Sequence, residues 1–468
     1  MSRTSLVTLI TLVLASSAGT ATAQVHPPEN VQLLANVDRG EGYSGNWGYT
    51  APNGVELAIS GTASGTTFID ATVPALAHEV AFVPGPNSTW REMATWSHYC
   101  YMVTESAGAA LQIVDLVNPL APVLVATLNP PALPYTAAHE IKIDQQTGHC
   151  YIAGSHNGGT QTGLIILDLN ANPVSPVQIG VWPQVYNGTE DYTHDLSILN
   201  GKAYIASIYQ GIVYVLDVTQ LPFPPIVGQW TYPTAFTHNT WPTADASYLV
   251  TTDENTGGHL RMWDIRNLGL PVQTDDFIPS TGALVHNAYI RGRYCFMSHY
   301  RDGLRVVDVA DPNNIVPVGW YDTYPQDGGG FNGAWGCYCF ATDPHIAYIS
   351  DRDTGTYILR FTPPGSAVAD PSGVTPVGPA LLGSFPNPFR PTTAIRFELA
   401  GAGPVRLRVY DAGGRMVRAL VDRPLGAGAQ SAVWDGRDDA GRLAASGVYY
   451  YHLETPGFSG SGSTVLAR

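Results

Sequence analysis

Short apolar segments recur along most of the chain, and six of them end in an aspartate. Each is preceded by another apolar segment, such as CYMV at Cys100, and is followed by a turn and a further apolar stretch. Four short strands per unit of about 48 residues are typical of a propeller blade. The repeated aspartates are Asp70, Asp115, Asp168, Asp217, Asp264 and Asp308, and a seventh copy, TYILRF, carries Arg360 in their place. Seven units predict a closed seven-bladed β-propeller.

The two ends of this repeat array predict how the ring closes. The seventh unit runs out after its third strand, at Phe361, and a linker rich in proline and glycine follows. An unassigned strand-like stretch, residues 31–37, lies ahead of the first unit. Borrowing it as the missing fourth strand would leave no open sheet edge. We therefore expect residues 31–37 to complete the last blade.

The flanking segments divide the chain into four parts. Residues 1–23 combine Arg3, an apolar run and a small-residue cleavage site, which is typical of a secretory signal peptide. Residues 24–362 are the predicted propeller, and residues 363–382 are the predicted linker. Residues 383–468 alternate apolar and polar positions between turn signals, which predicts a small antiparallel β-sandwich. The expected fold class is all-β.

Two segments resemble known families. The propeller region resembles the choice-of-anchor B family of LVIVD-repeat propellers, through NWGY at Asn46, TTFID at Thr66, THNTWPT at Thr237 and FNGAWG at Phe331. Residues 383–468 are similar to the Ig-like C-terminal sorting domain of type IX secretion, which is related in fold to the flagellar hook-capping Ig-like domain. PNPF at Pro386 and WDGRDDAGR at Trp434 carry that match. The resemblance implies an exported protein, at the cell surface or secreted, and implies no established activity.

Composition narrows the choice of partners. Charged residues make up 13% of the 468 residues, while there are 49 glycines and 36 prolines, which favours short strands and turns over helices. The net charge is −15, and no basic cluster interrupts it. Binding to a phosphate backbone needs concentrated positive charge, so nucleic acid is excluded as a partner. No stretch after the signal peptide resembles a membrane span.

A repeated histidine opens four consecutive units and is the candidate for chemistry. The first strand of a propeller blade lines the channel, so these side chains are expected to form an arc there. Imidazoles that face a shared space would bind a divalent metal of the zinc or copper kind. The alternative is that they tie adjacent blades together by hydrogen bonds, and their neighbours Glu140 and Asp195 are better candidates for such contacts than for metal ligands. The four histidines are His139, His194, His238 and His286.

A second polar group follows the second strands of the units. We expect these residues on loops at one face, where they would form either a binding rim or ordinary solvated loops. They are Glu105, His156, Asp253, Glu254, His299 and Asp351.

The five cysteines, Cys100, Cys150, Cys295, Cys337 and Cys339, cannot all pair with one another. No metal-type Cys-x-x-Cys spacing occurs, so buried thiols are favoured over a disulfide or a thiol ligand pair.

The sequence predicts a function class without naming a ligand. No phosphate-binding loop, nucleophile elbow or HExxH motif occurs, and no residues are assigned as catalytic. The main hypothesis is an exported propeller that binds an extracellular protein, a glycan or a small molecule, and that meets the export machinery through its C-terminal domain. The alternative is a metal-dependent hydrolase or oxidase that uses the histidine arc. A structural surface-layer component is a third hypothesis.

Overall fold

A computed structural model of the protein describes residues 28–466 except for 158–159, 162, 183–184, 187–188, 191, 280–281, 283, 326–329, 365–379, 386–388, 390–392, 400 and 427. The predicted signal peptide and most of the predicted linker lie outside the described residues. Across the described part, strands dominate and helix is limited to one 3₁₀ turn, η1 (Pro74–Leu76), which confirms the all-β fold class. None of the described helical segments is long and apolar enough to cross a membrane.

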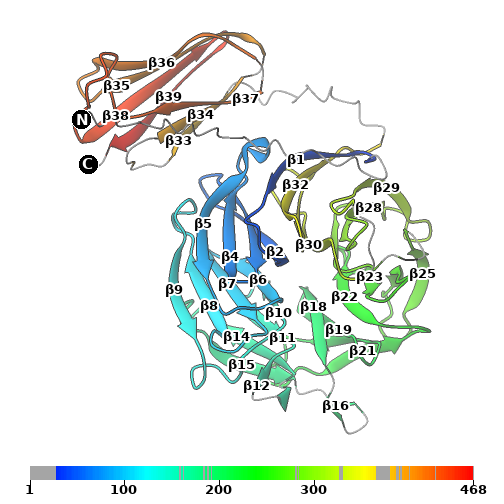
Figure 1. The fold of residues 1–468 in the computed structure, drawn as a ribbon. Coiled ribbons are helices and arrows are strands. Elements are labelled where there is room, and N and C mark those ends of the chain that lie inside the picture. The colour runs from blue at the N-terminus through cyan, green and yellow to red at the C-terminus, as the bar shows by residue number, and fades with distance from the viewer. Residues whose placement is uncertain are drawn as a thin grey trace, which may run out of the picture.

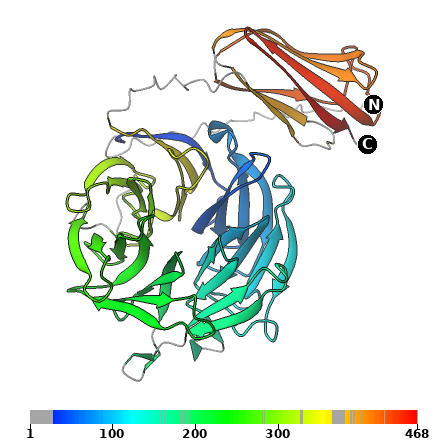
Figure 2. The same ribbon diagram turned by 180° about the vertical axis from the view of Figure 1, so that it is seen from behind.

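Seven four-stranded antiparallel sheets form the ring of Figure 1. The innermost strand of each sheet contacts its neighbours around the channel, and the turned view in Figure 2 shows the same ring from behind. The first three blades are built from β2 (Tyr43–Thr50), β3 (Glu56–Thr62), β4 (Gly65–Asp70) and β5 (His78–Pro84); β6 (Arg91–Trp96), β7 (Tyr99–Thr104), β8 (Leu111–Asp115) and β9 (Val123–Leu128); and β10 (Glu140–Asp144), β11 (His149–Ala153), β14 (Leu164–Asp168) and β15 (Val177–Trp182).

The next three blades repeat this order. Two short hairpins interrupt the regular strands, one between β11 and β14 of the third blade and one between the third and fourth blades. The hairpins are β12 (His156–Asn157) with β13 (Thr160–Gln161), and β16 (Val185–Tyr186) with β17 (Thr189–Glu190). The blades are β18 (Thr193–Leu199), β19 (Lys202–Ser207), β20 (Ile212–Asp217) and β21 (Ile226–Thr231); β22 (Thr237–Pro242), β23 (Tyr248–Asp253), β24 (Leu260–Asp264) and β25 (Val272–Phe277); and β26 (Ala288–Arg291), β27 (Tyr294–Ser298), β28 (Leu304–Asp308) and β29 (Val316–Tyr321).

The seventh blade closes the ring as the sequence predicts. It consists of β30 (Ala334–Tyr338), β31 (Ile346–Asp351), β32 (Gly355–Phe361) and β1 (Val31–Val37), and β1 pairs antiparallel with β32 from Val31↔Phe361 to Val37↔Thr356. Figure 1 shows the blue N-terminal strand lying along the olive last blade. This pairing satisfies the edge of β32 and joins the two ends of the propeller.

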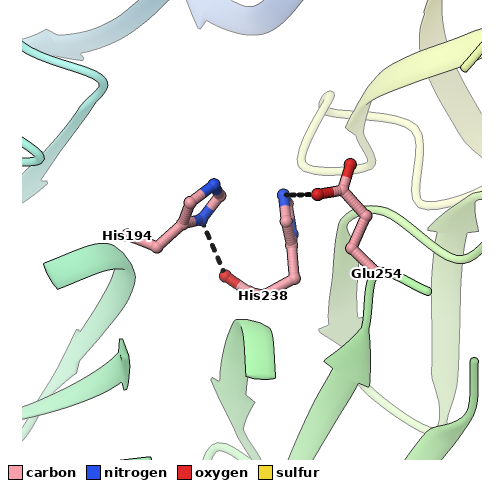
Figure 3. A group of neighbouring side chains, drawn as sticks. All are labelled: His194, His238 and Glu254. Carbon is pink, nitrogen blue, oxygen red and sulfur yellow. Dashed lines mark hydrogen bonds and ion pairs between the residues drawn. The ribbon is translucent and has the colours of Figure 1, made fainter. Parts of the chain in front are cut away.

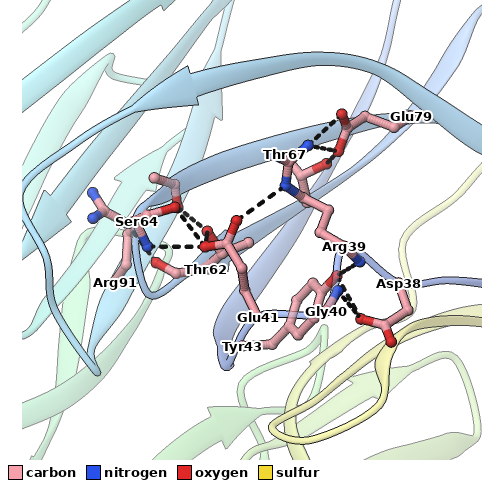
Figure 4. Close-up of polar contacts among 11 residues, drawn as sticks. Asp38, Arg39, Gly40, Glu41, Tyr43, Thr62, Ser64, Thr67, Glu79 and Arg91 are labelled. Carbon is pink, nitrogen blue, oxygen red and sulfur yellow. Dashed lines mark hydrogen bonds and ion pairs between the residues drawn. The ribbon is translucent and has the colours of Figure 1, made fainter.

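The connection from β1 into β2 is held by charged and hydroxyl groups (Figure 4). The Arg39 guanidinium pairs with the carboxylates of Glu79 and Glu41, and it also lies over the Phe82 ring, with Cζ 3.9 Å from the ring centroid. Glu41 in turn accepts hydrogen bonds from the hydroxyls of Thr62 and Ser64. These contacts fix the closing strand to the first blade.

The repeated aspartates act as turn caps rather than as ligands. Each accepts a hydrogen bond from the backbone N–H two residues later, as from Val117 to Asp115 Oδ1 at 2.8 Å and from Ala310 to Asp308 Oδ1 at 3.0 Å. Such Asx turns start the loop from the third strand to the fourth. The seventh copy has Arg360 because its fourth strand, β1, comes from the other end of the propeller and no such turn is needed.

The C-terminal part is a sandwich of two antiparallel sheets. One sheet contains β33 (Ala380–Phe385), β34 (Thr393–Leu399) and β37 (Gly428–Trp434), and the other has the order β36 (Met416–Leu425), β35 (Gly403–Asp411), β38 (Gly447–Thr455) and β39 (Phe458–Leu466). Phe397, Leu407, Trp434 and Leu453 are fully buried between them. The first strand begins three residues before the predicted boundary at residue 383.

Candidate functional site

Four imidazoles stand side by side at the end of the propeller where the innermost strands of the blades begin, which we call the mouth of the channel. His139 directly precedes β10, His194 lies in β18, His238 lies in β22, and His286 lies two residues before β26. Successive ring centroids are 4.3, 4.2 and 4.2 Å apart, and Trp335 continues the row 4.8 Å from His286. The structure therefore brings together the four histidines that the sequence singled out.

A repeated β-bulge places two of these histidines and Trp335. In β18 the pairing with β19 passes from Thr193↔Ser207 to Asp195↔Ala206, so His194 is an extra residue without a partner of its own. The same shift occurs around His238 in β22 and around Trp335 in β30. A bulge turns one side chain away from the regular alternation, and here the turned residue lies at the mouth.

Backbone carbonyls fix the orientation of two rings. His194 Nδ1 lies 3.2 Å from the carbonyl oxygen of His238, and His286 Nδ1 lies 2.6 Å from that of Trp335. Since a carbonyl oxygen only accepts, both Nδ1 atoms carry the proton and both Nε2 atoms keep a lone pair. His139 differs, because its Nδ1 contacts Glu105 Oε1 at 2.6 Å.

Burial decides the charge of the row. It lowers the pKa of His194 and His238 well below the usual range, and it lowers the pKa of His286 to about 3. For His139 burial acts in the same direction, but the hydrogen bond and charge of Glu105 outweigh it and raise the pKa. At neutral pH His194, His238 and His286 are therefore neutral.

Glu254 approaches the row from the loop after β23. Its Oε2 lies 3.7 Å from His238 Nε2, its Oε1 lies 3.9 Å from His286 Nε2, and Oε1 also accepts a hydrogen bond from the Tyr300 hydroxyl. Burial raises the pKa of Glu254 to about 7. Figure 3 shows its carboxylate facing His238, with His194 on the other side of the His238 ring.

One group of possible metal ligands is present among the described residues. It consists of His194, His238 and Glu254, whose ligand atoms all lie within 4.8 Å of one another. His139 and His286 are not part of this group. The sequence placed Glu254 in a different set, because nothing in the repeat shows that the loop after β23 bends toward the channel.

A layer of buried charges lies next to the histidines along the channel. Lys142 Nζ is 3.0 Å from Glu140 Oε2 and 3.3 Å from Asp195 Oδ1, and Asn239 of the next blade donates to Asp195 Oδ2 at 2.7 Å. Glu140 and Asp195 thus contact partners other than the histidines beside them, as the sequence analysis expected.

Burial also shapes the charge of this second layer. It raises the pKa of Glu140 to about 7, and together with the charge of Glu140 it raises that of Glu92 well above its usual range. Burial by itself lowers the pKa of Lys142, but Asp195 and Glu140 more than offset this effect, so the lysine stays charged. Sequence reasoning missed Lys142, because a single lysine on an apolar strand shows no repeat.

The six residues predicted as a loop rim divide into two sets. Glu105 and Glu254 face the histidine row, and His156 is half-buried in β12. Asp253, His299 and Asp351 are at most 1% exposed, which corrects the expectation of an open rim. Asp253 pairs with Arg261 of the same blade, and Asp351 accepts hydrogen bonds from the Thr323 hydroxyl, which follows the sixth blade, and from the Thr354 N–H.

All five cysteines are buried and unbonded to one another, which confirms the favoured interpretation. Burial raises the pKa of each thiol. Protonated, buried thiols are poor nucleophiles and poor metal ligands.

Exposed aromatic rings surround the same mouth. Tyr209 is 68% exposed, and its ring centroid lies 5.4 Å from Tyr192, which packs 5.8 Å from His194. From other blades, Phe331 packs on Tyr300 and Trp90 on Trp335, and both of these inner rings contact His286. Each exposed ring is therefore one side chain away from the histidine row.

Comparison with known proteins supports both halves of this architecture. Residues 389–456 match the family model described as the FlgD Ig-like domain. The C-terminal sandwich is thus Ig-like. Among solved structures, the β-propeller domain of Cps50 (Swd1) from Myceliophteria thermophila is similar with a TM-score of 0.52, covering 72% of this chain and 99% of that chain. At 11% identity this likeness shows the fold alone. A search of curated proteins finds no match.

Proposed function

We propose that the protein is an exported binding module of the cell surface or the surrounding medium. The mouth of the channel binds the ligand, and the Ig-like domain acts as the sorting domain of a type IX pathway. The observation that supports binding most directly is the set of exposed aromatic rings, Tyr209, Phe331 and Trp90, which pack on the aromatic residues that contact the histidine row. Aromatic residues of this kind dominate binding energies at protein surfaces.

The ligand class follows from this chemistry. Rings that stand around a polar floor suit a ligand with both an apolar face and hydrogen-bonding groups, such as a glycan or an aromatic side chain of an extracellular protein. A metal-dependent hydrolase or oxidase is the alternative, and it requires an ion at the histidine row.

The binding role is tested with two variants, one of Tyr209 and a matched control at Phe223. Tyr209 lies in the loop between β19 and β20 at the histidine mouth, whereas Phe223, 69% exposed, lies in the loop between β20 and β21 at the opposite end of the blade. Against ligands found by glycan-array and extracellular-protein screening, Tyr209→Ala should weaken binding at least tenfold and Phe223→Ala should leave it unchanged. Equal affinity of both variants and the wild type would place the binding face elsewhere.

The export role is tested in a bacterium with a type IX system. Three forms are compared: the full chain, a chain without residues 383–468, and a chain without residues 1–23. We expect the full chain outside the cell, the second form in the periplasm and the third in the cytoplasm. Normal surface display of the form without residues 383–468 would refute the sorting role.

A further inference from the structure

We propose that His194, His238 and Glu254 bind one zinc-type metal ion at the mouth of the channel. The inference is independent of the ligand proposed above, since it rests on the geometry of these three side chains. Their ligand atoms lie within 4.8 Å of one another. Two ligands held about 2.0–2.2 Å from a tetrahedral zinc ion are about 3.3–3.6 Å apart. The separation of 3.7 Å between His238 Nε2 and Glu254 Oε2 is close to that value.

The hydrogen bonding of His238 points to a missing partner. Its ring is buried, and its Nε2 lies 3.7 Å from Glu254 Oε2, which is too far for a hydrogen bond but fits two ligands of one ion. A buried polar group left in this state costs free energy, and an unseen ion is one of the explanations for it. An ion between Nε2 and the carboxylate would satisfy both.

The surroundings hold the other two ligands in the required state. The carbonyl of His238 accepts the Nδ1 proton of His194, so His194 Nε2 presents a lone pair. Tyr300 donates to Glu254 Oε1 and leaves Oε2 directed at His238. Carbonyls and hydroxyls that orient metal ligands in this way are the usual second layer of a metal site.

The donor set selects the metal. Two imidazole nitrogens and one carboxylate suit zinc, copper or iron(II), whereas calcium and magnesium prefer oxygen ligands alone. Three protein ligands leave a fourth position for water or for a bound molecule.

The test is a metal titration of the full mature chain without an affinity tag. Protein stripped with a chelator is titrated with Zn²⁺ by calorimetry and with Co²⁺ by visible absorption, whose intensity reports tetrahedral coordination. We expect one ion per chain, with affinity at least tenfold weaker in Glu254→Gln and in His194→Gln. The control is His139→Gln, which removes a stacked imidazole of the same row outside the group and should change affinity less than threefold.

Each outcome decides the proposal. Absence of zinc binding by the wild type, or unchanged binding in Glu254→Gln, overturns it. An equal loss in His139→Gln overturns the three-residue assignment. Thermal unfolding of the metal-free variants identifies any that fail to fold. Anomalous scattering at the zinc edge from crystals of the wild type then decides independently, since an ion bonded to residues other than these three also overturns the assignment.

Discussion

Lys142 places an ammonium between the carboxylates of Glu140 and Asp195 in the interior of the channel. Burying an ion pair gains little by itself, because both charges lose their hydration. Removing one partner is different, since it leaves an uncompensated charge in a low dielectric.

The first prediction is that Lys142→Met lowers the free energy of unfolding by about 3–5 kcal/mol, because two buried carboxylates lose their counter-charge. Adding Glu140→Gln to this variant should recover part of the loss. Lys202→Met, at a half-buried position on β19, is the control and should stay within about 0.5 kcal/mol. Urea unfolding measures all four proteins, and wild-type stability of Lys142→Met would contradict the prediction.

The second prediction concerns Asp351, whose pKa burial raises from 3.8 to about 6. Because the folded state binds the proton more tightly, this group stabilises the fold below about pH 4, and the contribution is lost as the pH rises through about 6. Between pH 4 and pH 7 the wild type should therefore lose up to about 3 kcal/mol relative to Asp351→Asn.

Urea unfolding at several pH values measures this difference. Asp217 is a control of opposite sign, because hydrogen bonds from Thr219 and Gln220 lower its pKa. The wild type should gain stability relative to Asp217→Asn as the pH rises. A difference between the wild type and Asp351→Asn that does not vary with pH would refute the assignment of a raised pKa.

At the scale of elements, β1 completes the last blade. It covers the edge of β32, and its Val31 packs in the same apolar cluster as Leu359 and Phe361. Without it, the backbone groups of β32 would face water and would pair with another chain.

The third prediction is that deleting Val31–Val37 lowers the thermal midpoint and promotes association. Size-exclusion chromatography with light scattering should show dimers or larger species. A chain that merely lacks residues 1–23 is the matched control and should remain monomeric. If the deletion protein were monomeric with an unchanged midpoint, the closing strand would not stabilise the ring.

The elements that the sequence predicts well are those that repeat. The aspartate-ending strands and the borrowed strand 31–37 follow from a regular pattern, because a blade buries the same positions each time. The bulges at His194 and His238 do not, since one extra residue leaves no mark in an alternating pattern. For the same reason the arc of histidines was predictable, whereas the approach of Glu254 and the burial of Asp351 depend on how individual loops fold back.

At the scale of the whole molecule, the propeller and the sandwich have separate interiors. Among the described residues, the apolar cluster of the sandwich draws on Leu381 to Leu466, and the propeller clusters contain residues up to Phe361. Each part can therefore bury its own core, which is the requirement for independent folding.

The last prediction follows from these two cores. Limited proteolysis should cut between residues 362 and 380 and release a propeller and a sandwich that both stay folded. Calorimetry of the intact chain should show two transitions, and the isolated propeller should reproduce one of them. Its midpoint should shift by no more than about 2 °C, because a stability change of 1 kcal/mol moves the midpoint of a 150–250-residue domain by about 2–4 °C. Phe361→Ala, in the propeller core, should lower only the propeller transition, and Trp434→Ala, in the sandwich core, only the other, each by removing a large buried ring. A single transition that both substitutions shift together would mean that the two parts unfold as one unit. The proposed function requires the opposite, because the sorting domain must engage the export machinery while the propeller keeps its ligand site.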